Sequence, residues 1–256
     1  MKRLPSLLLS GALALLAGCV KMEEVLTLKA DGGGTLELKY SVAEETISRI
    51  EAMRRLAADL EAAAGQKPPA PTACDYSRLL LNPRQADIES KLKEFEAFGV
   101  NTERLEVKTR DARRQVEIRV RFGSLAELAK TDFFQSYGFS LTRRKDGKYR
   151  LYREAHVKTP LPKNDDPEVI KTMTPMLEGF NVLLTLHTPG RVVSANAPVR
   201  SSYSVTWRYD FDRNPNALAA LENQEFEVVF EEEESRLPDI KRGGEPPPPV
   251  VPAPQA

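Results

Sequence analysis

Short runs in which apolar and polar residues alternate predict β-strands that pair as hairpins. The first pair flanks the turn Asp31-Gly32-Gly33-Gly34, where glycine supplies the positive φ angles that tight turns need. No Lys-Ser/Thr pair follows these glycines, so we interpret them as a hairpin turn and not as a phosphate-binding loop. The residues expected on the inward face of this hairpin are Leu26, Leu28, Ala30, Leu36, Leu38 and Tyr40.

Similar alternation recurs along the chain, and Asp146-Gly147 is a strong signal for a two-residue hairpin turn. A polar turn at 111–114 joins another predicted pair, and Pro189-Gly190 lies between two more predicted strands. The sequence therefore predicts an α+β fold, with an antiparallel sheet built from hairpins and packed on amphipathic helices. The alternating residues are Leu105, Val107 and Thr109; Val116, Ile118, Val120 and Phe122; Phe139 and Leu141; Tyr149 and Leu151; Val182, Leu184 and Leu186; Val192, Val193 and Ala195; Tyr203, Val205, Trp207 and Tyr209; and Phe226, Val228 and Phe230.

Helices are predicted where apolar residues recur at helical spacing behind a capping signal. Ser41-Val42-Ala43-Glu44 has the pattern of a capping box, and the spacing predicts a long helix over 42–64. Ser124-Leu125-Ala126-Glu127 is a second such box. Further helix starts are predicted at Asn82-Pro83, Asp166-Pro167 and Asn214-Pro215, each a cap residue followed by proline.

The N-terminus has the features of a lipoprotein signal. Lys2 and Arg3 precede an apolar stretch that is too short to span a bilayer, and Leu16-Ala17-Gly18-Cys19 resembles the lipobox of bacterial lipoproteins. The resemblance implies cleavage after residue 18 and attachment of lipid to the Cys19 thiol. We expect the protein to be anchored in the cell envelope, at the periplasmic face of the outer membrane in a Gram-negative host or the outer face of the cell membrane in a Gram-positive one.

Composition limits the classes of partner. The chain has 256 residues with 37 basic and 37 acidic side chains, so it gives no reason to expect nucleic acid as a partner. It contains two cysteines, and lipidation of Cys19 would leave Cys74 without an intramolecular partner. We interpret Cys74 as a buried or tolerated thiol, with intermolecular pairing as the alternative.

Candidate chemistry is sparse. His156 and His187 have no metal-ligand spacing around them, and the chain lacks the usual nucleophile, zinc and nucleotide motifs. We therefore expect no enzyme, no cofactor and no bound metal. Two weaker signals stay open: the aromatic face around Trp207 is either core or pocket wall, and basic residues at hairpin tips either contact anionic lipid or only aid solubility. These basic residues are Arg113, Arg114, Arg143, Arg144 and Lys145.

Taken in order, the lipobox and three further segments resemble the LppM-type domain of bacterial lipoproteins. The segments are VLTLKADGGGTLELKYSV, LEGFNVLLTLHTPGRVVSANA and SVTWRYD. The resemblance implies a helix-grip-like α+β domain over 19–232 and an expectation of lipid binding. It leaves 1–18 as the signal peptide and 233–256 as a disordered Pro-rich tail, in place of the family's C-terminal transmembrane helix.

Two functions remain open from the sequence. One is a tethered module that binds a lipid or other apolar ligand between helix 42–64 and a concave sheet; the other is a scaffold with a filled core that docks envelope proteins. An apolar cavity of several hundred Å³ would favour the first, and close packing the second.

Overall fold

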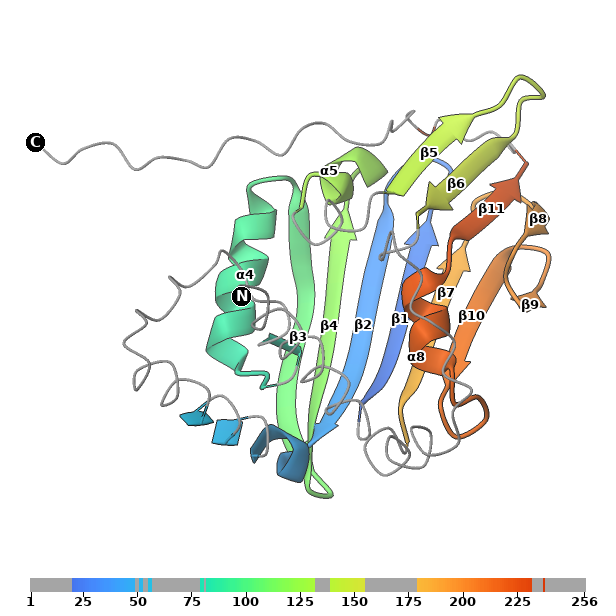
Figure 1. Ribbon diagram of the computed structural model, residues 1–256. Coiled ribbons are helices and arrows are strands. Elements are labelled where there is room, and N and C mark those ends of the chain that lie inside the picture. Colours follow the sequence, from blue (N-terminus) through green and yellow to red (C-terminus); the bar gives the residue numbers. More distant parts are fainter. Residues whose placement is uncertain are drawn as a thin grey trace, which may run out of the picture.

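The computed structural model describes residues 20–48, 51–52, 55–56, 79–80, 82–131, 139–154, 179–231 and 237. Within these residues the protein is an α+β domain with a seven-stranded sheet and a four-stranded sheet. The large sheet has the order β3-β4-β2-β1-β7-β10-β9, and the small sheet has the order β5-β6-β11-β8. Figure 1 shows α4 over the β3 side of the large sheet and the small sheet beside its other half.

The strands of the large sheet are β1 (Lys21–Leu28), β2 (Gly34–Ala43), β3 (Val100–Arg110), β4 (Arg113–Phe122), β7 (Asn181–His187), β9 (Val199–Arg200) and β10 (Ser204–Asp210). Those of the small sheet are β5 (Phe139–Arg143), β6 (Tyr149–Arg153), β8 (Val192–Ala195) and β11 (Phe226–Phe230). The helices with defined bounds are α4 (Gln85–Glu96), α5 (Leu125–Ala129) and α8 (Ala217–Asn223).

The predicted hairpins β1–β2, β3–β4 and β5–β6 are confirmed by the strand pairing. In the first turn the Gly33 amide donates to the Asp31 carboxylate at 2.9 Å, and Gly32 has a φ of 87°. Gly34 is required for a different reason, because a Cβ there would lie 2.1 Å from the Thr27 carbonyl oxygen and 2.6 Å from the Phe122 ring. The glycine run is therefore a hairpin turn packed tightly against β4.

Two strand relationships differ from the prediction. β1 and β7 pair in parallel, so the large sheet is mixed. This is sterically allowed because the two strands are far apart in the chain and no short turn fixes their direction. The segment after β7 also leaves the large sheet at Pro189-Gly190, and β8 pairs with β11 in the small sheet.

The predicted capping box at Ser41 is wrong, since β2 continues through Ala43 and helical residues begin at Glu44. The reason lies in β4: Arg113 donates to the Ser41 hydroxyl at 3.1 Å and Arg114 pairs with the Glu44 carboxylate at 3.0 Å. The Ser41 hydroxyl and the Glu44 carboxylate, which the capping box would need, therefore bind side chains of β4 instead. Of the predicted helix over 42–64, residues 42–43 belong to β2, residues 44–48, 51–52 and 55–56 are helical, and the others lie outside the described residues.

The other helix starts are partly confirmed. Ser124 and Glu127 form the predicted capping box at α5. α4 begins two residues beyond Pro83, and Asn82 is buried and hydrogen-bonded to Glu51 and Arg114 in place of capping the helix. α8 likewise begins after Pro215, with Asn216 at its N-cap position. The predicted start at 166–167 lies outside the described residues.

Strand alternation places apolar side chains of the large sheet on one inner face. α4 and the small sheet both lie against this face, because residues of each line cavities together with it. Its buried members include Leu28, Leu36, Tyr40, Val42, Val116, Val120, Phe122, Val182, Leu186, Val205, Trp207 and Tyr209.

Candidate ligand-binding site

A cavity of about 90 Å³ lies between the two sheets. Most of its lining residues are apolar, because inward-facing residues of β1, β7 and β10 meet those of β5, β6 and β11 there. Trp207 forms part of the wall and its ring contacts Phe226 edge-on, with 4.8 Å between ring centroids. The lining residues are Glu24, Leu26, Phe139, Leu151, Arg153, Leu184, Thr185, Leu186, Trp207, Phe226 and Val228.

Glu24 is an acidic residue on the apolar face. It lies in phase with Leu26 and Leu28 on β1, and its neighbours in register are Leu38 on β2 and Leu184 on β7. Burial raises the pKa of the Glu24 carboxyl above its ordinary value, and the positive charge of Arg153 opposes this effect without cancelling it. Glu24 therefore keeps its proton to a higher pH than an exposed glutamate.

Arg153 enters the cavity from the small sheet, at the end of β6. In register it faces Phe139 on β5 and Phe226 on β11. Its guanidinium carbon lies 3.9 Å from the centre of the Phe226 ring, a cation–π contact that keeps the charged plane against the apolar wall. The geometry thus fixes one positive charge at the rim of the apolar space.

Tyr209 adds a third polar group close to this pair. Its side chain is 6% exposed, and among the described residues its hydroxyl has no hydrogen-bond partner. Burial raises the pKa of the hydroxyl, while Arg153 acts in the opposite direction, so the phenol stays protonated at neutral pH. A buried O–H without a partner is unfavourable and is ready to donate to a ligand.

A second apolar cavity of about 70 Å³ lies between α4 and the large sheet. Leu36 and Leu38 form its floor, and these residues are the register partners of Leu26 and Glu24 from the first cavity. The two cavities therefore adjoin along the β1–β2 pair. Ile88, Leu92 and Phe95 of α4 cover the second cavity.

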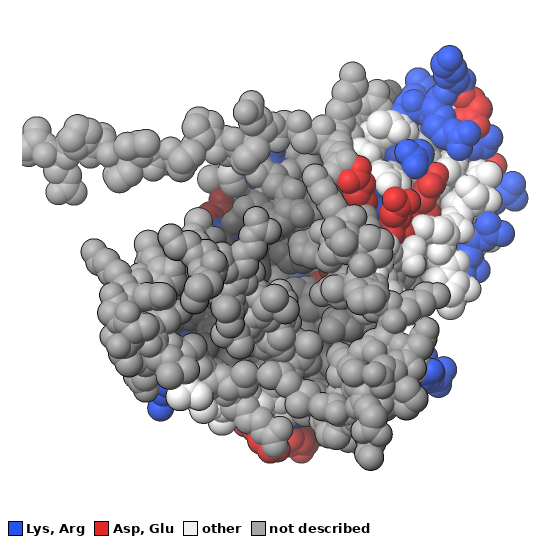
Figure 2. Space-filling model, viewed as in Figure 1, with Lys and Arg blue, Asp and Glu red and all other residues white. Residues whose placement is uncertain are grey.

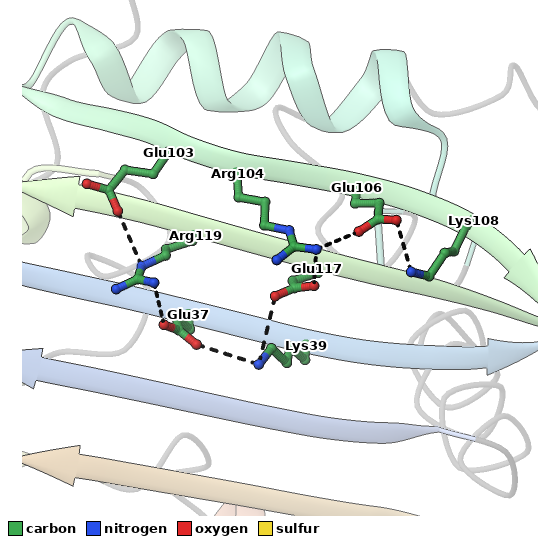
Figure 3. Close-up of polar contacts among 8 residues, drawn as sticks. All are labelled: Glu37, Lys39, Glu103, Arg104, Glu106, Lys108, Glu117 and Arg119. Atoms are coloured by element: carbon green, nitrogen blue, oxygen red, sulfur yellow. Dashed lines mark hydrogen bonds and ion pairs between the residues drawn. The ribbon is translucent and has the colours of Figure 1, made fainter.

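The opposite, outer face of the large sheet is charged (Figure 3). Arg119 bridges Glu37 and Glu103 at 3.3 and 3.2 Å, and Arg104 bridges Glu117 and Glu106 at 3.1 and 2.9 Å. Arg104 thereby screens the like charges of Glu106 and Glu117, which are opposite each other in the β3–β4 register. An open polar groove of about 550 Å³ crosses this face, with Lys21, Glu23, Lys39, Lys108 and Asp210 among its lining residues.

The structure places the candidate residues from the sequence in different surroundings. Cys19, Cys74 and His156 lie outside the described residues, and His187 is exposed at the end of β7. Trp207 and Tyr209 are buried on the inner face, whereas Tyr203 precedes β10 and is 48% exposed. The aromatic strand face is therefore both core and cavity wall.

The basic residues predicted at hairpin tips differ in burial and in their contacts. Arg113 and Arg114 are half-buried and bound to Ser41 and Glu44, so they stabilise the β2–β4 pairing. Arg143, Arg144 and Lys145 are exposed at the β5–β6 hairpin. Figure 2 shows basic side chains gathered in the region where Figure 1 places this hairpin.

Among the residues that the structure describes, no helix is both long and apolar enough to cross a membrane. The same residues contain no group of three or more side chains placed to hold a metal ion.

Comparison with known proteins gives a distant similarity. No family model matches the chain, and no curated protein matches it. Among solved structures, the folded domain of LppM from Mycobacterium tuberculosis is similar at a TM-score of 0.38 and 12% identity, over 84% of this chain and 91% of that chain.

Proposed function

We propose that this protein is a lipoprotein, anchored in the cell envelope through Cys19, whose domain binds a lipid or other apolar ligand on the inner face of the large sheet. The supporting observation is that two apolar cavities adjoin on this face along the β1–β2 pair. Leu26, Leu38, Leu184 and Ile118 line these cavities and are only half-buried, so the face has apolar area left to cover. The proposal assigns no catalytic step to the site.

The sizes of the cavities indicate the shape of the ligand. Each is smaller than the roughly 300 Å³ at which small-molecule sites begin. Neither apolar cavity reaches the several hundred Å³ that the sequence analysis gave as favouring ligand binding over a scaffold. We therefore propose a slender ligand, such as one acyl chain, that lies along the apolar face.

The outer face of the large sheet supports a second candidate function. Its groove of about 550 Å³ is larger than either inner cavity and is lined by charged side chains of both signs. This arrangement suits a polar protein partner better than a lipid, because exposed charges at a surface mainly set orientation and specificity. Under this alternative the protein is a scaffold and its inner face is core.

Native mass spectrometry distinguishes the two functions. The full chain would carry Cys19→Ser, so that no covalently attached acyl group is mistaken for a ligand, and would be expressed in a bacterium and analysed with organic extraction. The proposal predicts one apolar molecule per protein, retained from the cell or taken up from added lipid. A bare protein that also takes up no added lipid would contradict it, and a single stoichiometric protein partner would support the scaffold.

A further inference from the structure

Two ionisable groups line the cavity between the sheets, and Tyr209 lies beside it with its ring centre 6.5 Å from that of Phe226 in the cavity wall. Glu24 comes from β1, Arg153 from β6 and Tyr209 from β10. Glu24 and Arg153 both line the cavity, and the Arg153 charge acts on Glu24 and on Tyr209. An apolar core alone does not require any of these groups, since a leucine at position 24 would match both register neighbours, Leu38 and Leu184.

The chemistry of the cluster favours a bound anion. A guanidinium has five N–H donors in a fixed fork that matches a carboxylate, so Arg153 can hold a ligand in addition to its other contacts. The Tyr209 phenol is a donor, and a protonated Glu24 is a donor as well. A ligand carboxylate near Glu24 would favour that protonated form further, because two carboxylates close together cannot both be ionised.

We propose that this cavity binds the carboxylate head of a long-chain carboxylic acid, with Arg153 as its counter-charge and with Glu24 and Tyr209 as hydrogen-bond donors. The inference rests on the proposed function, because the acyl chain is the slender ligand placed there on the inner face. The cavity of about 90 Å³ is small, which favours a compact head such as a carboxylate over a phospholipid head with its glycerol. From this cavity the chain can follow the β1–β2 pair toward the space under α4.

The side chains around Glu24 explain why a carboxylate head is preferred over an uncharged one. β2 and β7 present Leu38 and Leu184 to it, and β5 and β11 present Phe139 and Phe226 to the same cavity. Among the described residues, Arg153 is the charged group that acts on Glu24, and it also acts on Tyr209. An uncharged head would gain no charge-assisted hydrogen bond from Arg153.

Ligand binding can be measured by the fluorescence of Trp207, because it is the single tryptophan of the chain and lines the cavity. The full chain with Cys19→Ser would be titrated with hexadecanoic acid, hexadecan-1-ol and hexadecyl phosphate below their aggregation limits, while the tryptophan emission is followed. The acid is expected to bind roughly 10- to 100-fold more tightly than the alcohol, which is the range for a charge-assisted hydrogen bond. Arg153→Met should remove this difference, and Arg150→Met is the matched control because Arg150 lies on the same strand but pairs with Glu227.

The outcomes of this titration test the head-group inference and the proposed function separately. Equal affinities for acid and alcohol would overturn the head-group inference and leave the proposed function standing. Tighter binding of the phosphate than of the acid would overturn the assignment of a carboxylate. Absence of binding for all three ligands, and for added phospholipid, would overturn the proposed function together with this inference. The comparison of ligands uses unsubstituted Arg153, so it decides the point even where Arg153→Met does not fold.

Discussion

Arg153 of the small sheet and Glu24 of the large sheet line the same apolar cavity, and the charge of Arg153 lowers the pKa that burial raises at Glu24. Burial is the larger effect, so the carboxyl remains easier to protonate than it is in the unfolded chain. An arrangement that weakens the fold at neutral pH is typical of a functional site and not of a core chosen for stability.

The first prediction concerns Glu24→Gln and pH. The folded-state pKa of Glu24 is raised, so the native protein binds this proton more tightly than the unfolded chain does. Ionisation of Glu24 therefore lowers the free energy of unfolding. This loss is absent below the ordinary glutamate pKa of 4.5, grows as pH rises toward the folded-state pKa, and is complete above it. Glu24→Gln should therefore be more stable than the parent at pH 7 and equally stable below about pH 4.5, as measured by urea unfolding.

Glu23→Gln is the matched control for this prediction, because Glu23 is the adjacent residue and is exposed on the outer face. The stability of Glu23→Gln at pH 7 should stay close to that of the parent. A Glu24→Gln protein that is less stable than the parent at pH 7 would show that Arg153 outweighs burial at this site.

A second prediction tests the ligand position by filling the cavity. Leu184 lines the cavity and Leu183 points to the opposite face of β7. Leu184→Phe should lower the affinity for an acyl chain by at least about 10-fold, because the added volume competes with the ligand. Leu183→Phe should leave the affinity unchanged in the same fluorescence titration. Equal affinities in the two variants would place the ligand elsewhere.

A third prediction concerns the close approach at Gly34. Gly34→Ala would place a methyl group 2.1 Å from the Thr27 carbonyl oxygen, a backbone atom that cannot move without disrupting the β1–β2 pair. We expect a loss of about 2 kcal/mol or more in the free energy of unfolding. Thr35→Ala, one residue along the same strand, should cost less than half as much. A fully stable Gly34→Ala protein would contradict the packing of this hairpin against Phe122.

A fourth prediction compares the two capping patterns of the sequence. Ser124→Ala removes the side chain that accepts from the Glu127 amide, and should cost about 1 kcal/mol, the usual value for an N-cap. Ser41→Ala should instead weaken the contact with Arg113, since Ser41 is a strand residue. The double variant Ser41→Ala/Arg113→Met should therefore show coupling between the two sites, measured by a thermodynamic cycle. Additive effects would contradict the observed role of Ser41.

Much of the local structure could be predicted from the sequence, because it depends on neighbouring residues. The turns at 31–34 and Asp146-Gly147 and the box at Ser124 follow from local chemistry, and all three are present. The parallel pairing of β1 with β7 and the passage of β8 into the small sheet depend on contacts between distant segments, which alternation does not specify. The end of β2 was misplaced for the same reason, since Arg113 and Arg114 come from another strand.

The sequence contains a signal for the candidate site that the sequence analysis did not use, namely charged residues at inward positions of predicted strands. Glu24 is in phase with Leu26 and Leu28, and Arg153 is in phase with Tyr149 and Leu151, so strand alternation places both charged residues on the apolar face. A charged residue at an inward position of a predicted strand is uncommon and indicates a functional site. Their common cavity could not be predicted, because the two strands belong to different sheets.

The most direct test of the central claim is quenching of Trp207 by an acyl chain. The full chain with Cys19→Ser would be titrated with stearic acid carrying bromine atoms near the middle of its chain, and with unlabelled stearic acid as the control. Because bromine quenches tryptophan only at short range and Trp207 lines the cavity between the sheets, the account predicts saturable quenching with one ligand bound per protein. Binding without quenching would place the ligand away from this cavity, and no binding at all would contradict the proposed function.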